Sequence, residues 1–122
     1  MSDPQIDLSA RVFSEGFGLI TASGYINNEG GQAVADAATD LVGRGCKSLL
    51  VDLEGTRIIN SIGVSILLEI MEKLMEGGGE LAFCSLTPTI AKTFEIMGLD
   101  QYAQVFSDRE TALSRLIGTV DG

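Results

Sequence analysis

Two adjacent polar residues, Asn60 and Ser61, stand between an apolar run and an amphipathic stretch. The run over residues 49–53 is typical of a buried strand, and residues 62–75 have the length and apolar spacing of a helix. Asn and Ser both cap helix N-termini. A hydroxyl there faces free backbone N–H groups and the positive end of the helix dipole, so the place tolerates an anion, including a phosphate on the serine itself. Two uses follow: both residues are only caps, or Ser61 accepts a phosphate.

The rest of the chain offers little other chemistry. It contains no histidine, which removes the commonest general base and the commonest metal ligand. Cys46 and Cys84 stand singly without CxxC spacing, so we interpret them as buried thiols in a reducing compartment. The segments 45–48 and 77–79 lack the motif or the position of a phosphate-binding loop. We therefore predict that the protein is not an enzyme and binds no metal and no cofactor.

The composition is that of an ordinary globular protein, with 45% hydrophobic and 20% charged residues. The 122 residues fit a single domain over residues 1–122, with an ordered core over about 5–118. The net charge of −9 argues against nucleic acid or an anionic membrane as a partner, because like charges repel. No apolar run approaches the roughly 20 residues that span a bilayer. Residues 1–5 lack a basic region and an apolar signal core, so we expect a cytoplasmic protein without membrane insertion.

Apolar periodicity predicts the elements that position Asn60 and Ser61. In chain order these are strands over 6–13 and 17–22, a polar loop over 23–28, a helix over 32–42, a strand over 49–53, a helix over 62–75, a strand over 80–85, a helix over 88–97, an edge strand at 105–106 and a helix that ends at Gly118. The order ββαβαβαβα indicates an α/β protein with a parallel or mixed sheet and helices packed on it. Sites in such folds lie at the carboxyl ends of strands, which places the loop over 23–28 beside Asn60.

Four segments in this order resemble a STAS domain, the fold of bacterial anti-sigma factor antagonists. They are Gly24-Tyr25-Ile26-Asn27, residues 50–53 followed by 59–63, the run from 79–81 to 87–88, and residues 96–99. The resemblance covers nearly the whole chain. It implies a STAS-like mixed sheet with packed helices, and a bacterial signalling protein that regulates transcription through protein–protein interaction.

The resemblance also assigns a role to Ser61. In the family, a partner anti-sigma kinase phosphorylates the serine of this loop and a phosphatase removes the phosphate. The unphosphorylated form binds the anti-sigma factor and frees the sigma factor. The resemblance therefore makes Ser61 the phosphoacceptor, with an anti-sigma factor or serine kinase protein as the partner. We expect the partner to bind the neighbouring residues, which are Gly24, Tyr25, Asn27, Asn60, Ile62 and Gly63.

The chain departs from the family at this loop. Asn60 replaces an aspartate, and Ile62 replaces a second hydroxyl residue. The family often has Gly-Glu-Leu-Asp where this chain has Gly24-Tyr25-Ile26-Asn27, so two or three acidic positions are neutral here. The alternative function is therefore a constitutive STAS scaffold in a signalling or lipid-transport complex, with Ser61 unphosphorylated and serving only as a helix cap.

Overall fold

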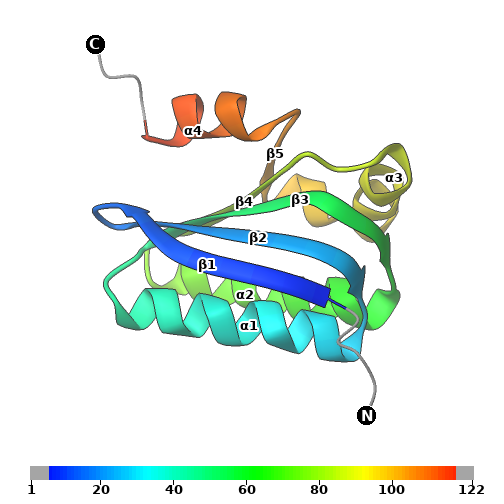
Figure 1. Cartoon of the computed structure of the whole chain (residues 1–122), viewed down its shortest axis with the longest axis horizontal. Helices are drawn as coiled ribbons and strands as arrows, with labels where there is room; N and C mark the ends of the chain where they lie inside the picture. The colour runs from blue at the N-terminus through cyan, green and yellow to red at the C-terminus, as the bar shows by residue number, and fades with distance from the viewer. Residues whose placement is uncertain (1–5, 118–122) are drawn as a thin grey trace.

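The computed structural model describes residues 6–117, so the expected core limits at Gln5 and Gly118 and the sequence features of residues 1–5 lie outside the described residues (Figure 1). The elements in chain order are β1 (Ile6–Ser14), β2 (Phe17–Ile26), α1 (Asn28–Gly43), β3 (Ser48–Ile59), α2 (Ser61–Glu76), β4 (Glu80–Cys84), α3 (Pro88–Met97), a short 3-10 turn (Leu99–Gln101), β5 (Gln104–Phe106) and α4 (Arg109–Ile117). The predicted order ββαβαβαβα and the α/β class are confirmed.

The five strands form one mixed sheet in the order β1-β2-β3-β4-β5. The opening hairpin pairs β1 antiparallel to β2, and every later strand joins its neighbour in parallel. The parallel strands follow from the helical crossovers between them, because a tight turn can only reverse the chain. The carboxyl ends of β2 and β3 therefore lie at the same edge of the sheet.

Helices cover both faces of the sheet (Figure 1). Helices α1 and α2 lie on one face over the larger core, and α4 lies on the other face over a smaller cluster. Strand β3 contributes to both, since Leu49 and Val51 belong to the first cluster and Leu50 to the second. Burial on both faces explains why this strand is a continuous apolar run instead of an alternating one.

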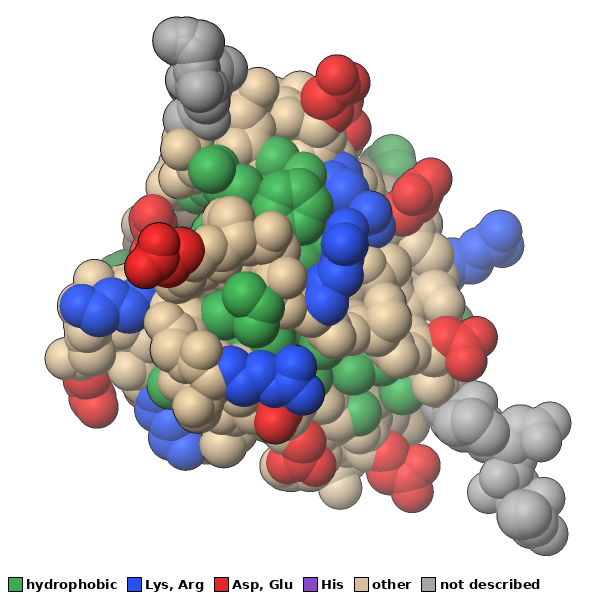
Figure 2. Space-filling model, turned by 60° about the vertical axis from the view of Figure 1, so that its left-hand side comes forward, with side chains coloured by type: hydrophobic (Ala, Val, Ile, Leu, Met, Phe, Trp, Pro, Cys, Tyr) green, Lys and Arg blue, Asp and Glu red, His purple; other side chains and the backbone are tan. Residues whose placement is uncertain are grey.

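Helix α4 is short, and it covers its face of the sheet only in part. Figure 2 shows hydrophobic side chains at the surface below α4, with basic and acidic side chains around them. The cluster beneath the helix includes Phe106, Leu113 and Leu116, which are only partly buried. No helix within residues 6–117 is both long enough and apolar enough to cross a membrane.

The prediction of a polar loop over residues 23–28 is wrong for its first four residues. Residues 23–26 continue β2 and pair with residues 55–59 of β3, which also runs six residues past its expected end. Thr56 is fully buried in this extension, and its hydroxyl donates a hydrogen bond to the carbonyl of Ala22 at 3.0 Å. Composition predicts a loop here, but the strand pairing satisfies the backbone of these polar residues.

Asn27 or Asn28, followed by Glu29, is the predicted cap of the first helix, and Asn27 is confirmed as the N-cap. Helix α1 begins at Asn28, four residues earlier than its apolar pattern indicates. Its first turn contains Gly30 and Gly31, which lower helix propensity. A Cβ on Gly30 would lie 2.4 Å from the carbonyl oxygen of Tyr25, so the helix approaches β2 too closely for any larger residue. Gly30 and Gly31 therefore weaken the helix signal in the sequence, and the same two residues allow the helix to pack closely.

Candidate partner-binding site at the start of α2

Asn60 links the end of β3 to the start of α2. It is the N-cap of the helix, and its Oδ1 accepts a hydrogen bond from the Gly63 amide at 2.8 Å. The backbone N–H of Asn60 donates a hydrogen bond to the carbonyl of Ile26 at 3.2 Å, which ties the cap to the end of β2. The capping role predicted for Asn60 is confirmed, and the helix start is fixed to two neighbouring strands.

Tyr25 completes the network around the cap. The Asn60 Nδ2 donates to the Tyr25 hydroxyl at 3.4 Å, so both ends of the amide are engaged. An amide can accept from the helix and donate to a phenol at once, whereas an ionised carboxylate can only accept. Asparagine at this position therefore makes one hydrogen bond, from its Nδ2 to the Tyr25 hydroxyl, in which an aspartate could not be the donor.

Gly63 lets α2 pack directly against the end of β2. A Cβ at this position would lie 2.2 Å from the carbonyl oxygen of Ile26, which is shorter than any real contact. Gly63 is buried, so it supports the site from beneath and does not offer a side chain to a partner. The structure gives Gly63 a packing role, and its contact with a partner stays a prediction.

Ser61 is the first residue of α2 and is exposed. The expectation that Ser61 acts as the cap is wrong, because Asn60 occupies that position. The Ser61 hydroxyl is therefore not used for capping. The first turn of α2 holds no acidic residue, so no carboxylate competes there for the positive end of the helix dipole.

Two exposed isoleucines lie on either side of Ser61 in the sequence. Ile58 at the end of β3 is 57% exposed, and Ile62 in the first turn of α2 is 52% exposed. Sequence reasoning placed Ile62 in the site but omitted Ile58. The signal that could have found Ile58 is the paired run Ile58-Ile59, where only Ile59 packs against the core. Exposed apolar side chains that gather beside a polar loop contribute to a contact surface when a partner covers them.

The predicted site residues near the end of β2 lie in two places: Asn27 lies at the edge near Asn60, whereas Gly24 lies within the strand. Asn27 caps α1, and its Oδ1 accepts from the Gly30 amide at 2.9 Å. Asn27 follows Ile26 directly, so it lies at the same edge as Asn60. Gly24 lies back within β2 opposite Thr56, with φ of 112° at the register shift before Tyr25. Gly24 shapes the strand and is not brought to Ser61.

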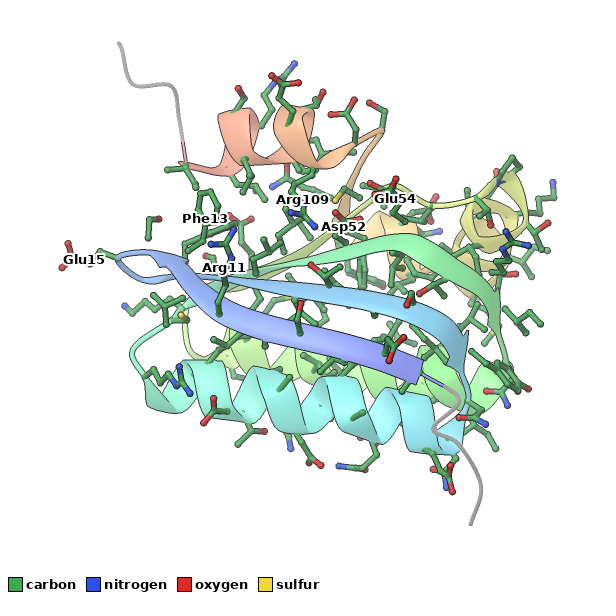
Figure 3. The ribbon with its side chains drawn as sticks, in the orientation of Figure 1. Arg11, Phe13, Glu15, Asp52, Glu54 and Arg109 are labelled. Atoms are coloured by element: carbon green, nitrogen blue, oxygen red, sulfur yellow. The ribbon has the colours of Figure 1, made fainter. Side chains whose placement is uncertain are left out.

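A second polar cluster, absent from the sequence predictions, lies on the α4 face of the sheet (Figure 3). Asp52 is 1% exposed, and its carboxylate accepts from Arg109 Nε at 2.7 Å and from the Glu54 amide at 3.0 Å. Arg109 also donates to the Thr21 hydroxyl at 3.1 Å. Because all these groups are paired with one another, the cluster fastens α4 to the sheet.

Cys84 lies opposite Asp52 on the neighbouring strand β4. Burial raises the pKa of its thiol to about 11, and the nearby Asp52 carboxylate adds to the rise. Burial also raises the pKa of Cys46. Both cysteines are free and buried, which confirms the prediction of buried thiols.

The comparisons with known proteins agree with this architecture. The family model described as the STAS domain matches residues 10–112. BtrV of Bordetella bronchiseptica, named as an anti-sigma factor antagonist, is 26% identical over 98 residues, which are 80% of this chain and 84% of BtrV.

Three solved structures share the fold. An anti-sigma factor antagonist from Mycobacterium paratuberculosis has a TM-score of 0.80 at 23% identity, covering 96% of this chain and 99% of that one. The anti-sigma factor antagonist SpoIIAA in its unphosphorylated form has a TM-score of 0.80 at 20% identity, covering 94% and 100%. Its phosphorylated form from Bacillus has a TM-score of 0.71 at 19% identity, covering 90% and 99%.

Because the family model covers most of its length, the chain belongs to the STAS domain family. Within that family it is an anti-sigma factor antagonist-like module.

Proposed function

We propose that the protein is a phosphorylation-controlled binding module whose switch is Ser61. In its unphosphorylated form it binds an anti-sigma factor through the surface around the start of α2. A serine kinase partner adds the phosphate and a phosphatase removes it. The observation that carries the proposal is the exposed Ser61 hydroxyl at the first position of α2, next to a cap that does not use it.

The position suits a phosphate without loss of the fold. A phosphoserine carries about −1.5 to −2 charge at neutral pH, and a helix N-terminus stabilises negative charge. The cap bond from the Gly63 amide to Asn60 does not involve Ser61, so modification leaves it intact. SpoIIAA, which shares this fold, is known in both unphosphorylated and phosphorylated forms.

The flanking surface suits a switch in binding. Ile58 and Ile62 are exposed, and an apolar contact over them must exclude water. A dianion on Ser61 holds a hydration shell between or beside these two side chains. Phosphorylation therefore opposes burial of the isoleucines while the fold stays unchanged.

The proposal is tested by phosphate transfer from ATP by an anti-sigma serine kinase of this family, read by intact mass and peptide mapping. One phosphate should appear on Ser61 and none on the Ser61→Ala variant. Ser65→Ala is the matched control, because Ser65 is exposed one turn further along the same helix, and it should be phosphorylated like wild type. Transfer to neither wild type nor Ser65→Ala would favour a constitutive scaffold.

A further inference from the structure

The two edges of the sheet differ in length. At one edge β5 has three residues, whereas at the other edge β1 has nine. Within the described chain β1 pairs only with β2, so its other side carries a row of free backbone N–H and C=O groups. A long free edge is a template for another strand, and proteins commonly block it with lysine, proline or a short strand. Residues 6–14 contain neither lysine nor proline.

The side chains of β1 alternate between two faces. Asp7, Ser9 and Arg11 lie on the α4 face of the sheet, since Arg11 is opposite Leu19 and Leu19 packs in the cluster beneath α4. All three are exposed. Among residues 6–117, neither Asp7 nor Arg11 takes part in an ion pair. The Arg11 guanidinium instead lies 5.1 Å from the centre of the Phe13 ring (Figure 3).

We propose that β1 is a self-association edge, which pairs antiparallel with β1 of a second copy about a two-fold axis at Ser9. In this register Asp7 of each copy lies opposite Arg11 of the other, so the dimer contains two Asp7–Arg11 pairs. Opposite charges directly across a strand pair are stabilising, and like charges are destabilising. A two-fold interface requires such self-complementarity, because one patch meets its own copy.

The other face of β1 agrees with the same register. The register about Ser9 places Leu8 opposite Ala10 and Ile6 opposite Val12, so every cross-strand pair on this face is apolar. Ile6 and Leu8 already pack against the main core, whereas Val12 is 41% exposed and gains cover from the pairing. The free backbone groups of β1, the charged pairs on one face and the apolar pairs on the other therefore all favour the alignment about Ser9.

Neighbouring registers lack this match. With Ala10 on the axis, Asp7 would lie opposite Phe13 and Arg11 opposite Ser9. With Leu8 on the axis, Asp7 would lie opposite Ser9 and Arg11 would find no carboxylate opposite it. Charge complementarity thus selects the alignment about Ser9.

The flank of α1 that faces β1 would border the second copy. Val34 and Leu41 of α1 are buried against the sheet, and Ala35 and Val42 line the groove toward α2. Helical spacing then puts Ala33 and Ala37 on the flank toward β1, together with the exposed Asp40–Arg44 ion pair. Ser61 lies beyond β2 and β3, so the assembly leaves both copies of the proposed switch accessible.

Charge reversal tests the pairing in solution. Sedimentation equilibrium of wild type over a concentration series should show reversible dimerisation. Arg11→Asp sets carboxylates against Asp7, and Asp7→Arg sets guanidinium groups against Arg11, so each variant should dimerise about tenfold more weakly or worse. An equimolar mixture of the two variants restores both opposite-charge pairs and should form a heterodimer. Circular dichroism melting of each variant checks that the monomer remains folded.

Several results would overturn the proposal. Wild type that stays monomeric at every concentration excludes the interface. Variants that both dimerise as tightly as wild type, or a mixture that associates no better than either variant alone, exclude the Asp7–Arg11 pairing.

Cysteine cross-linking tests the register independently. Only a residue on the two-fold axis meets its own copy, so Ser9→Cys should form an intermolecular disulfide under mild oxidation. Ala10→Cys is the matched control and should cross-link much more slowly. The native thiols are buried, so they contribute little background. Preferred cross-linking of Ala10→Cys would place the axis elsewhere and reject the alignment about Ser9.

Discussion

Arg109, the first residue of α4, donates from its Nε to the buried Asp52 carboxylate at 2.7 Å. The two residues are 57 positions apart in the sequence, and the bond joins α4 to the middle of β3. A carboxylate that is 1% exposed needs such a partner, because an unpaired buried charge is costly. This pair fixes the start of the last helix to β3, and Ala112, Leu113 and Leu116 pack the rest of the helix against the apolar cluster beneath it.

Loss of this pair should destabilise the protein. We predict that Arg109→Met lowers the free energy of unfolding by about 1–3 kcal/mol, because Asp52 would keep its burial and lose its charged partner. The value is below that of a fully enclosed pair, since the Arg109 side chain is 40% exposed. Urea unfolding is the measurement. Arg115→Met on the same helix is the control, with an expected change within about 0.5 kcal/mol. Equal losses for the two variants would contradict a specific role of the pair.

The glycine beneath the helix start should not tolerate a methyl group. Gly63→Ala would push a Cβ into the Ile26 carbonyl, so we expect a loss of about 1–3 kcal/mol, as for other overpacked sites. Gly43→Ala is the matched control, because no atom lies within 4 Å of its added Cβ. Thermal and urea unfolding of both variants measure the difference. Gly63→Ala as stable as Gly43→Ala would show that α2 does not pack as closely as described.

The order of elements could be predicted from the sequence, because apolar spacing reports which local faces are buried. The start of α2 could also be predicted, since Asn60 combines cap chemistry with the strand before it and the helix after it. The ends of β2 and β3 could not, because polar residues such as Thr56 are held by a partner strand distant in the sequence. The Asp52–Arg109 pair is missed for the same reason. Tertiary pairing, and not local pattern, determines these features.

The buried thiols should be unreactive in the folded protein. The thiolate is the reactive species, and burial raises the pKa of Cys84 to about 11 and raises that of Cys46. At pH 8 both groups are therefore protonated as well as covered. We predict that a thiol reagent modifies neither cysteine in native protein over the time in which it modifies both in urea. Rapid modification of Cys84 at pH 8 would contradict its burial beneath α4.

Substitution of Asn60 should affect the stability of the protein and the phosphorylation rate of Ser61 differently. Asn60→Asp keeps an oxygen for the Gly63 amide, so the melting temperature should change little. Asn60→Ala removes the cap and should cost about 1 kcal/mol. We predict that Asn60→Asp raises the rate of Ser61 phosphorylation by a family kinase, because a carboxylate can orient the hydroxyl and attract basic groups. Asn27→Asp should add a smaller gain.

The assay for this prediction is transfer of labelled phosphate from ATP, with Ser61→Ala as the blank. A slower rate for Asn60→Asp than for wild type would show instead that the kinase is matched to asparagine. Unequal melting temperatures for wild type and Asn60→Asp would show that the Nδ2 contact with Tyr25 contributes to stability.

The central claim is that the state of Ser61 controls partner binding. The direct measurement is titration calorimetry of the cognate anti-sigma factor against wild type and stoichiometrically phosphorylated protein, with Ser65→Asp as a control for added charge one turn away. We predict that phosphorylation weakens the complex by more than about tenfold, or 1.4 kcal/mol, and that Ser65→Asp has a smaller effect. Equal affinity of the unphosphorylated and phosphorylated proteins would contradict the switch.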